Sequence, residues 1–195
     1  MTLSTKTISF KYPEFAKIKE GIALDDSFQV GSYSEGRWKK PDQTMFIESI
    51  MMNMATQPII IVDISECLEN CIEGTADYNY FKGWLDKGFE WLSVDGNNRS
   101  ITIHDFYNDK VRLHARKRYQ IEHKNGRTLE FMLSRNECYY SSLPVELRAK
   151  LDESEVSVVI VTRATRQDLT DLFIRVNSGV LLQSLVDKQG QVSCR

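Results

Sequence analysis

The stretch Phe89-Glu90-Trp91-Leu92-Ser93-Val94-Asp95-Gly96-Asn97-Asn98-Arg99 decides how the middle of this chain folds. Its first six residues carry the aromatic and β-branched side chains that are typical of a strand. Apolar positions return at helical spacing over residues 100–107, so the sequence predicts a strand, a turn at Asp95-Gly96 and then a helix. The first N–H groups of a helix are unpaired and lie at the positive end of its dipole, which favours an anion such as phosphate. Arg99 would add a permanent charge and a two-pronged contact.

The residues 95–99 also have a purely structural interpretation. Asp-Gly is a common turn dipeptide, and Asn is a common helix cap. A motif of this length is weak evidence when it stands alone. Other features of the sequence are therefore needed to distinguish a phosphate site from an ordinary capped helix.

Helical and strand patterns alternate on both sides of this stretch. Residues 65–87 are rich in acidic and aromatic side chains, and we expect them to form a helical insert. The other elements that we predict are helices over residues 12–21, 42–54, 143–151 and 166–176, loop or extended chain over 24–34, a buried strand over 58–64, antiparallel strands over 111–114, 118–121 and 128–133, and a strand over 155–162.

This order of elements predicts an α/β (α+β) fold with a mixed sheet flanked by helices. At 195 residues, 42% hydrophobic and 27% charged, the chain fits one globular domain over residues 1–195. It contains no apolar run of membrane-spanning length, and its N-terminus lacks the apolar core of a signal peptide. We therefore expect a cytoplasmic protein without a membrane partner.

A net charge of −2 gives the chain no general attraction to nucleic acid. Its one dense basic stretch lies at residues 112–118, where Lys and Arg equally suit the exposed edge of a hairpin. Neither the cysteines nor the histidines show the spacing of a metal site or of a disulfide framework, so we expect reduced thiols. If the basic stretch at residues 112–118 contacts nucleic acid, the contacting residues would be Arg112, Arg116, Lys117 and Arg118.

Four motifs in order resemble the ParB/sulfiredoxin-like domain at the N-terminus of GmrSD-type modification-dependent restriction enzymes. The family's hallmark, Asp-Gly-Gln-Gln-Arg after a strand, stands here with both glutamines shortened to asparagine. The resemblance covers roughly residues 28–183. Its other pieces are Gly36-Arg37-Trp38 followed by Gln43 and residues 46–50, then Pro58 to Ile61, and finally Phe173-Ile174-Arg175-Val176-Asn177-Ser178-Gly179 with Leu181 or Leu182.

The resemblance implies a site in which the Asp-Gly turn and the late Arg-x-Asn segment converge on a nucleoside triphosphate. It assigns catalytic roles to Asp95, Asn98 and Arg99, with Asp95 orienting a ribose, a water or a magnesium ion. The shorter asparagine side chains keep the amide chemistry but reduce its reach, which makes binding a firmer expectation than catalysis. The residues expected to bind the nucleotide are Gly96, Asn97, Arg175, Asn177 and Gln43.

Three functions follow from these expectations. The first is a nucleoside triphosphate-binding domain that hydrolyses its ligand slowly in a DNA-related system, such as a phage or restriction system, with DNA or a separate DNA-acting protein as partner. The second is a phosphotransferase that acts on a hydroxyl of a small molecule or modified base, with Asp63, Asp95 or Asp105 as its base. The third is a DNA- or protein-binding module without catalysis. The HNH nuclease residues of the family do not occur in this sequence, so we expect nuclease activity to lie elsewhere.

Overall fold

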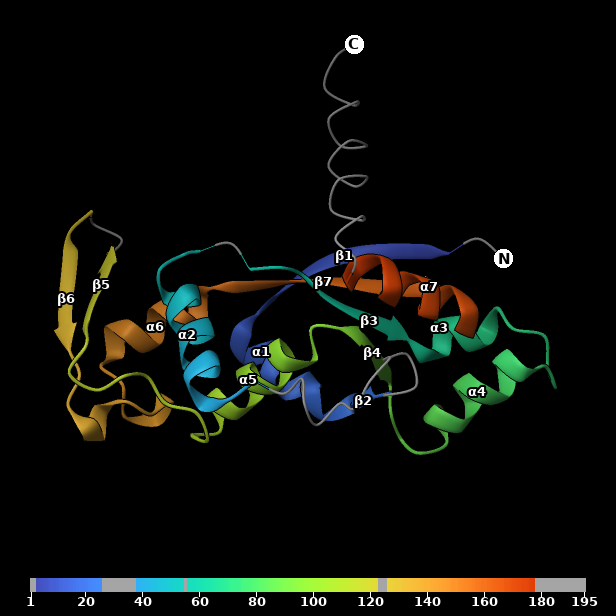
Figure 1. Cartoon of the computed structure of the whole chain (residues 1–195), viewed down its shortest axis with the longest axis horizontal. Helices are drawn as coiled ribbons and strands as arrows, with labels where there is room; N and C mark the ends of the chain where they lie inside the picture. The colour runs from blue at the N-terminus through green and yellow to red at the C-terminus, as the bar shows by residue number, and fades with distance from the viewer. Residues whose placement is uncertain (1–2, 26–37, 55, 123–125, 178–195) are drawn as a thin grey trace, which may run out of the picture.

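Five strands form a mixed sheet at the centre of the molecule, in the order β1-β7-β3-β4-β2. The computed structural model describes residues 3–25, 38–54, 56–122 and 126–177 (Figure 1). Strands β1 and β7 pair antiparallel, as do β3 and β4, whereas β3 pairs parallel with β7 and β2 pairs parallel with β4. The strands are β1 (Ser4–Lys11), β2 (Ile22–Leu24), β3 (Ile59–Asp63), β4 (Trp91–Asp95) and β7 (Glu155–Arg163).

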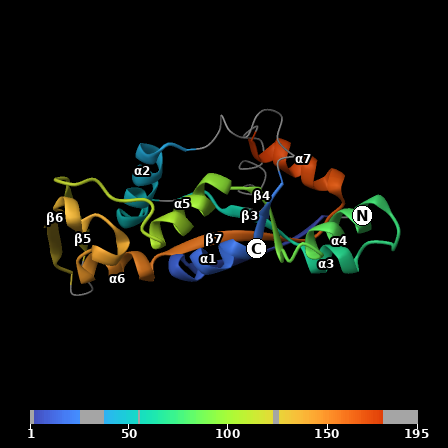
Figure 2. The same cartoon turned by 90° about the horizontal axis from the view of Figure 1, so that it is seen from below.

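Helices cover both faces of this sheet (Figures 1 and 2). Along β3, Ile59 and Ile61 belong to one hydrophobic core while Ile60 and Val62 belong to another, because successive strand residues point to opposite faces. The first core includes side chains of α1 (Tyr12–Ile18), α2 (Lys40–Met51), α5 (Asn97–Tyr107) and α6 (Val145–Glu153), and the second includes those of α3 (Ile64–Glu69), α4 (Ala76–Leu85) and α7 (Arg166–Asn177).

The predicted mixed α/β architecture is confirmed, and the predicted insert is helical, since it contains α3 and α4. A hairpin of β5 (Arg118–Glu122) and β6 (Thr128–Met132) forms a separate two-stranded sheet at one end of the molecule (Figure 1). Tyr119 and Ile121 alternate with exposed residues along β5 and are buried in the first core. These two side chains therefore fix the hairpin to that core.

One expectation about strands is wrong, and two strands were not predicted. Residues 111–114 form no strand of the hairpin sheet; Arg112 makes a single bridge to Tyr139 instead. The chain here is extended, and its alternation arises because Val111 and Leu113 are buried in the first core. In addition, the prediction omitted β1, a polar edge strand, and the short β2. Over the described ranges, no helix is both long and apolar enough to cross a bilayer.

Candidate functional site

The junction between β4 and α5 is built on Gly96. Asp95 ends the strand, and Gly96 is the N-cap of the helix with φ 90° and ψ 19°, a left-handed conformation that side chains with a Cβ rarely adopt. A Cβ atom at this position would lie 3.0 Å from Nη2 of Arg99 and 3.2 Å from the Cα atom of Ile59. Glycine therefore serves two needs here, a positive φ and a close approach of the backbone to β3.

The N–H groups of the first turn of α5 have no carbonyl partner within the helix itself, as at the start of any helix. The backbone N–H of Ser100 is the first to bond within the helix, to the carbonyl oxygen of Gly96 at 2.9 Å. The N-cap glycine has no side chain to accept from the turn, and the turn contains no acidic residue. The positive end of the helix dipole is therefore not neutralised by a residue of the helix itself, which suits the binding of an anion.

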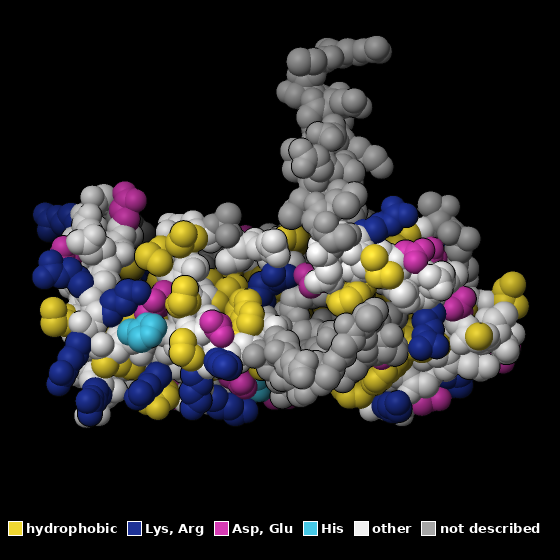
Figure 3. Space-filling view, in the orientation of Figure 1, with side chains coloured by type: hydrophobic (Ala, Val, Ile, Leu, Met, Phe, Trp, Pro, Cys, Tyr) yellow, Lys and Arg dark blue, Asp and Glu magenta, His cyan; other side chains and the backbone are white. Residues whose placement is uncertain are grey.

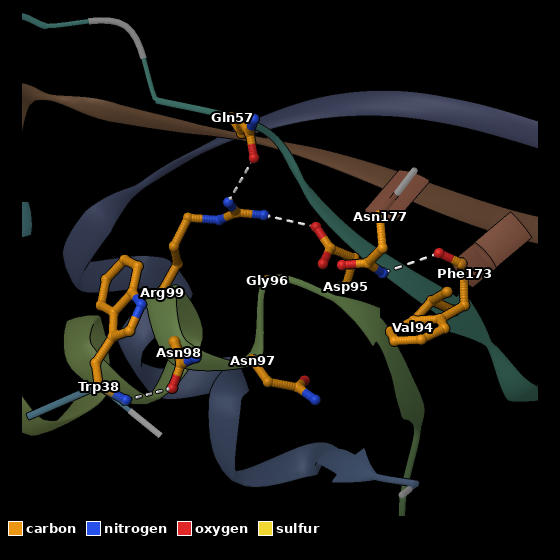
Figure 4. A pocket seen from close by; sticks show the side chains of 10 residues that line it. All are labelled: Trp38, Gln57, Val94, Asp95, Gly96, Asn97, Asn98, Arg99, Phe173 and Asn177. Carbon is orange, nitrogen blue, oxygen red and sulfur yellow. Dashed lines mark hydrogen bonds and ion pairs between the residues drawn. The ribbon is translucent and has the colours of Figure 1, made fainter. Parts of the chain in front are cut away.

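Arg99 is held by the protein from three directions, and Figure 4 shows its bonds to Asp95 and Gln57. Its Nη2 donates to Oδ2 of Asp95 at 2.8 Å and to the carbonyl oxygen of Pro58 at 3.0 Å, and its Nη1 donates to Oε1 of Gln57 at 3.1 Å. The side chain is only 14% exposed, and its Nε is buried without a partner among the described residues. Of the five N–H donors of a guanidinium, these bonds use three. Arg99 thus fixes α5 against β4 and the start of β3.

A cavity of about 320 Å³ opens beside this junction (Figure 4). Most of its polar wall is amide: Gln57, Asn97, Asn98 and Asn177 all contribute. Its only ionisable residues among the described lining are Asp95 and Arg99, which neutralise each other. The remaining lining residues are Trp38, Val94, Gly96 and Phe173.

Two asparagines in this wall have different tasks. Asn98 holds the chain that leads into α2, because its Oδ1 accepts from the backbone N–H of Trp38 at 3.0 Å. Asn97 is 8% exposed, and its Oδ1 is buried without a hydrogen-bond partner among the described residues. An unpaired buried carbonyl oxygen is costly and calls for a donor. Among the described lining residues, Asn97 is thus the one with a buried side-chain oxygen that has no hydrogen-bond donor.

The structure brings most of the predicted nucleotide site together. Residues 95–99 and Asn177, which are far apart in sequence, line the same cavity. Gln43 on α2 and Arg175 on α7 are not among the described lining residues. The motif residues at 36, 37, 179, 181 and 182 lie outside the described part of the chain.

Sequence reasoning did not assign Gln57 or Phe173 to the site, and Trp38 entered it only as part of a motif. Trp38 packs against Phe46, with 5.4 Å between ring centroids, and also lines the cavity. Gln57 carried no local signal, because its place in the site depends on Arg99, 42 residues away. Phe173 was quoted as the first residue of the late motif, but no role was assigned to it.

The predicted basic stretch divides into residues with separate surroundings. Lys117 bonds to the buried carboxylate of Glu48, and Nη1 of Arg118 lies 3.7 Å from Oε2 of Glu130. Arg112 and Arg116 make no ion pair with any described residue. This stretch is therefore not one continuous patch of unpaired cations.

Glu48 is the most deeply buried carboxylate of this region, at 3% exposure. Besides the Lys117 ammonium, it accepts from the Tyr119 hydroxyl at 2.7 Å and from Nδ1 of His114 at 2.9 Å. Burial alone would raise the pKa of Glu48, but the bonds from Lys117, Tyr119 and His114 outweigh it, and the pKa lies below its ordinary value. Glu48 thus joins α2 to the start of the hairpin as an ionised group.

The described residues form no preformed metal site and no disulfide. They contain no group of three or more His, Cys, Asp or Glu side chains that would hold a metal ion. Cys67, Cys71 and Cys138 are free thiols, and Cys194 lies outside the described range. Burial raises the pKa of Cys67 to about 12, so this thiol stays protonated and unreactive at neutral pH.

Comparison with known proteins does not assign the chain to a family. No protein-family model matches it. No curated protein and no solved structure is significantly similar to it. The function therefore has to be argued from the geometry of the site.

Proposed function

We propose that the cavity beside α5 binds a nucleoside triphosphate. The observation that carries the proposal is that one wall suits both an anion and a hydrogen-bond donor. The start of α5 suits a phosphate oxygen, because no acidic residue in its first turn neutralises the positive end of its dipole, and the buried Oδ1 of Asn97 has no donor among the described residues. A nucleotide supplies both, since it carries phosphate oxygens together with ribose hydroxyls and base N–H groups. Inorganic phosphate in its ionised forms offers far fewer donors.

The dimensions and the surroundings of the cavity support the same ligand. Its volume of about 320 Å³ is at the lower end of the range for small-molecule sites. Trp38 and Phe173 provide aromatic surface next to the polar wall, against which a base can stack. The meeting of the Asp95–Arg99 turn with Asn177 in one cavity also supports our inference that the chain is a ParB/sulfiredoxin-like domain.

Slow hydrolysis of the bound triphosphate is part of the proposal. Asp95 is the one carboxylate among the described lining residues, so it would hold a magnesium ion that arrives on the phosphates. This fits the ordinary mode of Mg²⁺ binding, in which one or two carboxylates assist the substrate's own oxygens. Arg99 keeps Asp95 in place through their ion pair, and it stabilises phosphate charge only with its remaining donors. Because so few groups would assist the reaction, we expect hydrolysis of the triphosphate to be slow.

A binding module without catalysis is the second candidate. It is favoured by the Asp95–Arg99 pair, because each charge is already compensated by the other within the protein. Transfer of phosphate to a hydroxyl acceptor remains the third, with Asp95 the one of its three possible bases that lines the cavity. In the leading proposal the phosphate is transferred to water and released. In the second candidate no phosphate is transferred, and in the third it passes to the acceptor.

A melting experiment tests binding. We expect ATP, GTP, CTP or UTP with magnesium to raise the melting temperature, because a ligand that binds only the folded state stabilises it. Asn177→Ala should remove most of this shift while leaving the unliganded protein intact, since among the described residues the Asn177 amide bonds only to the nearby carbonyl of Phe173, at 2.9 Å. Phosphate release without an acceptor then separates hydrolysis from the alternatives.

Asn108→Ala is the matched control. Asn108 also lies at the C-terminal end of a helix, and its amide makes the same bond to the carbonyl oxygen four residues earlier, at 2.8 Å. Asn108 is not part of the cavity lining, so its variant should keep the full nucleotide shift. If no nucleotide changes the melting temperature of the wild type, or if both variants lose the shift equally, the cavity is not a nucleotide site.

A further inference from the structure

A second and larger hollow lies between the start of α2, the extended chain after α5, and the 3-10 helix η3 (Arg135–Glu137). Its volume is about 680 Å³. Four basic side chains line it, and no described Asp or Glu does. We call this hollow the basic groove, and its cations are Lys40, Lys110, Arg112 and Arg135.

The backbone holds the basic groove in shape. Val111 and Leu113 are buried, so the intervening Arg112 points outward. The backbone N–H of Leu113 donates to the carbonyl oxygen of Cys138 at 2.9 Å, and Arg112 is bridged to Tyr139. The buried hydroxyl of Thr44 donates to the carbonyl oxygen of Arg112 at 2.8 Å, which ties α2 to this wall. The wall that carries Arg112 is therefore held in place by both α2 and the segment around Tyr139.

Most of the charge in the groove is not neutralised. Lys40, Arg112 and Arg135 have no ion-pair partner within the described ranges, and Lys110 lies 3.6 Å from Oδ1 of Asp105 with its side chain 62% exposed. The whole chain carries a net charge of −2, so this is a local excess. Figure 3 shows Lys and Arg side chains gathered over the same end of the molecule, around α2 and the β5–β6 hairpin. Such a concentration attracts a polyanion.

We propose that the basic groove binds single-stranded nucleic acid through its phosphates. Tyr139 lines the groove and is 36% exposed, so its ring offers an unpaired base a stacking surface. A cationic groove with an aromatic platform is the common design of single-strand binding sites. This site is distinct from the nucleotide cavity, with which it shares no described lining residue.

Fluorescence anisotropy with a labelled oligothymidylate of about 12 nucleotides tests the proposal. We expect binding that weakens as salt rises, with a logarithmic slope of about −0.7 for each phosphate neutralised. Arg112→Gln/Arg135→Gln should lower the affinity by about tenfold or more and reduce the slope by about 1.4. Tyr139→Leu should lower the affinity for the single strand by about fivefold and leave the affinity for a duplex unchanged.

The control variant also removes two positive charges, but at positions outside the basic groove. Lys17→Gln/Lys87→Gln alters two exposed lysines on α1 and after α4, outside the groove, and should keep the wild-type affinity and slope. Melting curves verify that each variant is folded, and the melting shift caused by nucleoside triphosphates should be the same in all of them. Equal losses in the two double variants, tighter binding of a duplex of the same length, or no oligonucleotide binding at low salt would overturn the proposal.

Discussion

Arg99 and Asp95 form an ion pair across the β4–α5 junction, with Nη2 2.8 Å from Oδ2. Both side chains are largely buried, and the same Nη2 also donates to the carbonyl oxygen of Pro58 at 3.0 Å. The arginine that the motif offers to a phosphate is therefore also a structural link between three elements. Any experiment on this residue has to separate its effect on the fold from its effect on a ligand.

Arg99→Lys should lower the free energy of unfolding by about 1–3 kcal/mol. A lysine ammonium cannot reproduce the planar fork that serves Asp95, Pro58 and Gln57 together. Urea unfolding provides the measurement, and Arg112→Lys is the control, because Arg112 is exposed and makes no ion pair among the described residues. Equal stability of Arg99→Lys and wild type would show that the three bonds contribute little.

Gly96→Ala should be one of the most destabilising small substitutions in the chain, at about 3 kcal/mol. Its new Cβ would face a positive φ and contacts of 3.0–3.2 Å with Arg99 and Ile59. Gly88 has a similar φ of 86°, but a Cβ placed there would meet no atom within 4 Å, so Gly88→Ala isolates the backbone strain, at about 1 kcal/mol. Chemical denaturation of both variants measures the difference. Similar losses in the two would mean that the contacts with β3 relax freely.

Acid should weaken the link between α2 and the hairpin. The pKa of Glu48 lies below its ordinary value of 4.5 in the folded protein, so its charge stabilises the fold above that pH, and this contribution is lost as the pH falls through the folded-state pKa. Glu48→Gln should cost about 1–3 kcal/mol at neutral pH, and the difference from wild type should shrink in acid.

Unfolding curves recorded from pH 7 down to about pH 3 test this dependence. Glu69→Gln is the control, since Glu69 is exposed on α3 and its carboxylate makes no hydrogen bond or ion pair within the described ranges. A constant gap between Glu48→Gln and wild type across the titration would contradict a stabilising charge on Glu48.

Local patterns predicted the β4–α5 junction because everything needed for it is adjacent in sequence: a β-branched run, a glycine with positive φ and a helical repeat. Edge strand β1 was missed because nearly all of its residues are exposed, so burial imposes no hydrophobic alternation on it. The alternation at residues 111–114 was real, but it reflects burial in a core and not pairing in a sheet. Partners such as Gln57 for Arg99 depend on packing between distant segments, which no local pattern encodes.

Asn97→Leu should separate ligand binding from stability. The buried Oδ1 of Asn97 lacks a partner among the described residues, so replacing the amide by an apolar side chain of similar shape removes a desolvated group without breaking a bond that the structure shows. The unliganded variant should melt at or above the wild-type temperature and should lose the shift produced by a nucleoside triphosphate. Ser93→Ala is the control, because the hydroxyl oxygen of Ser93 is also buried without a partner among the described residues but lies outside the cavity lining. A variant of Asn97 that melts lower and still responds fully to nucleotide would show that this oxygen serves the fold and not a ligand.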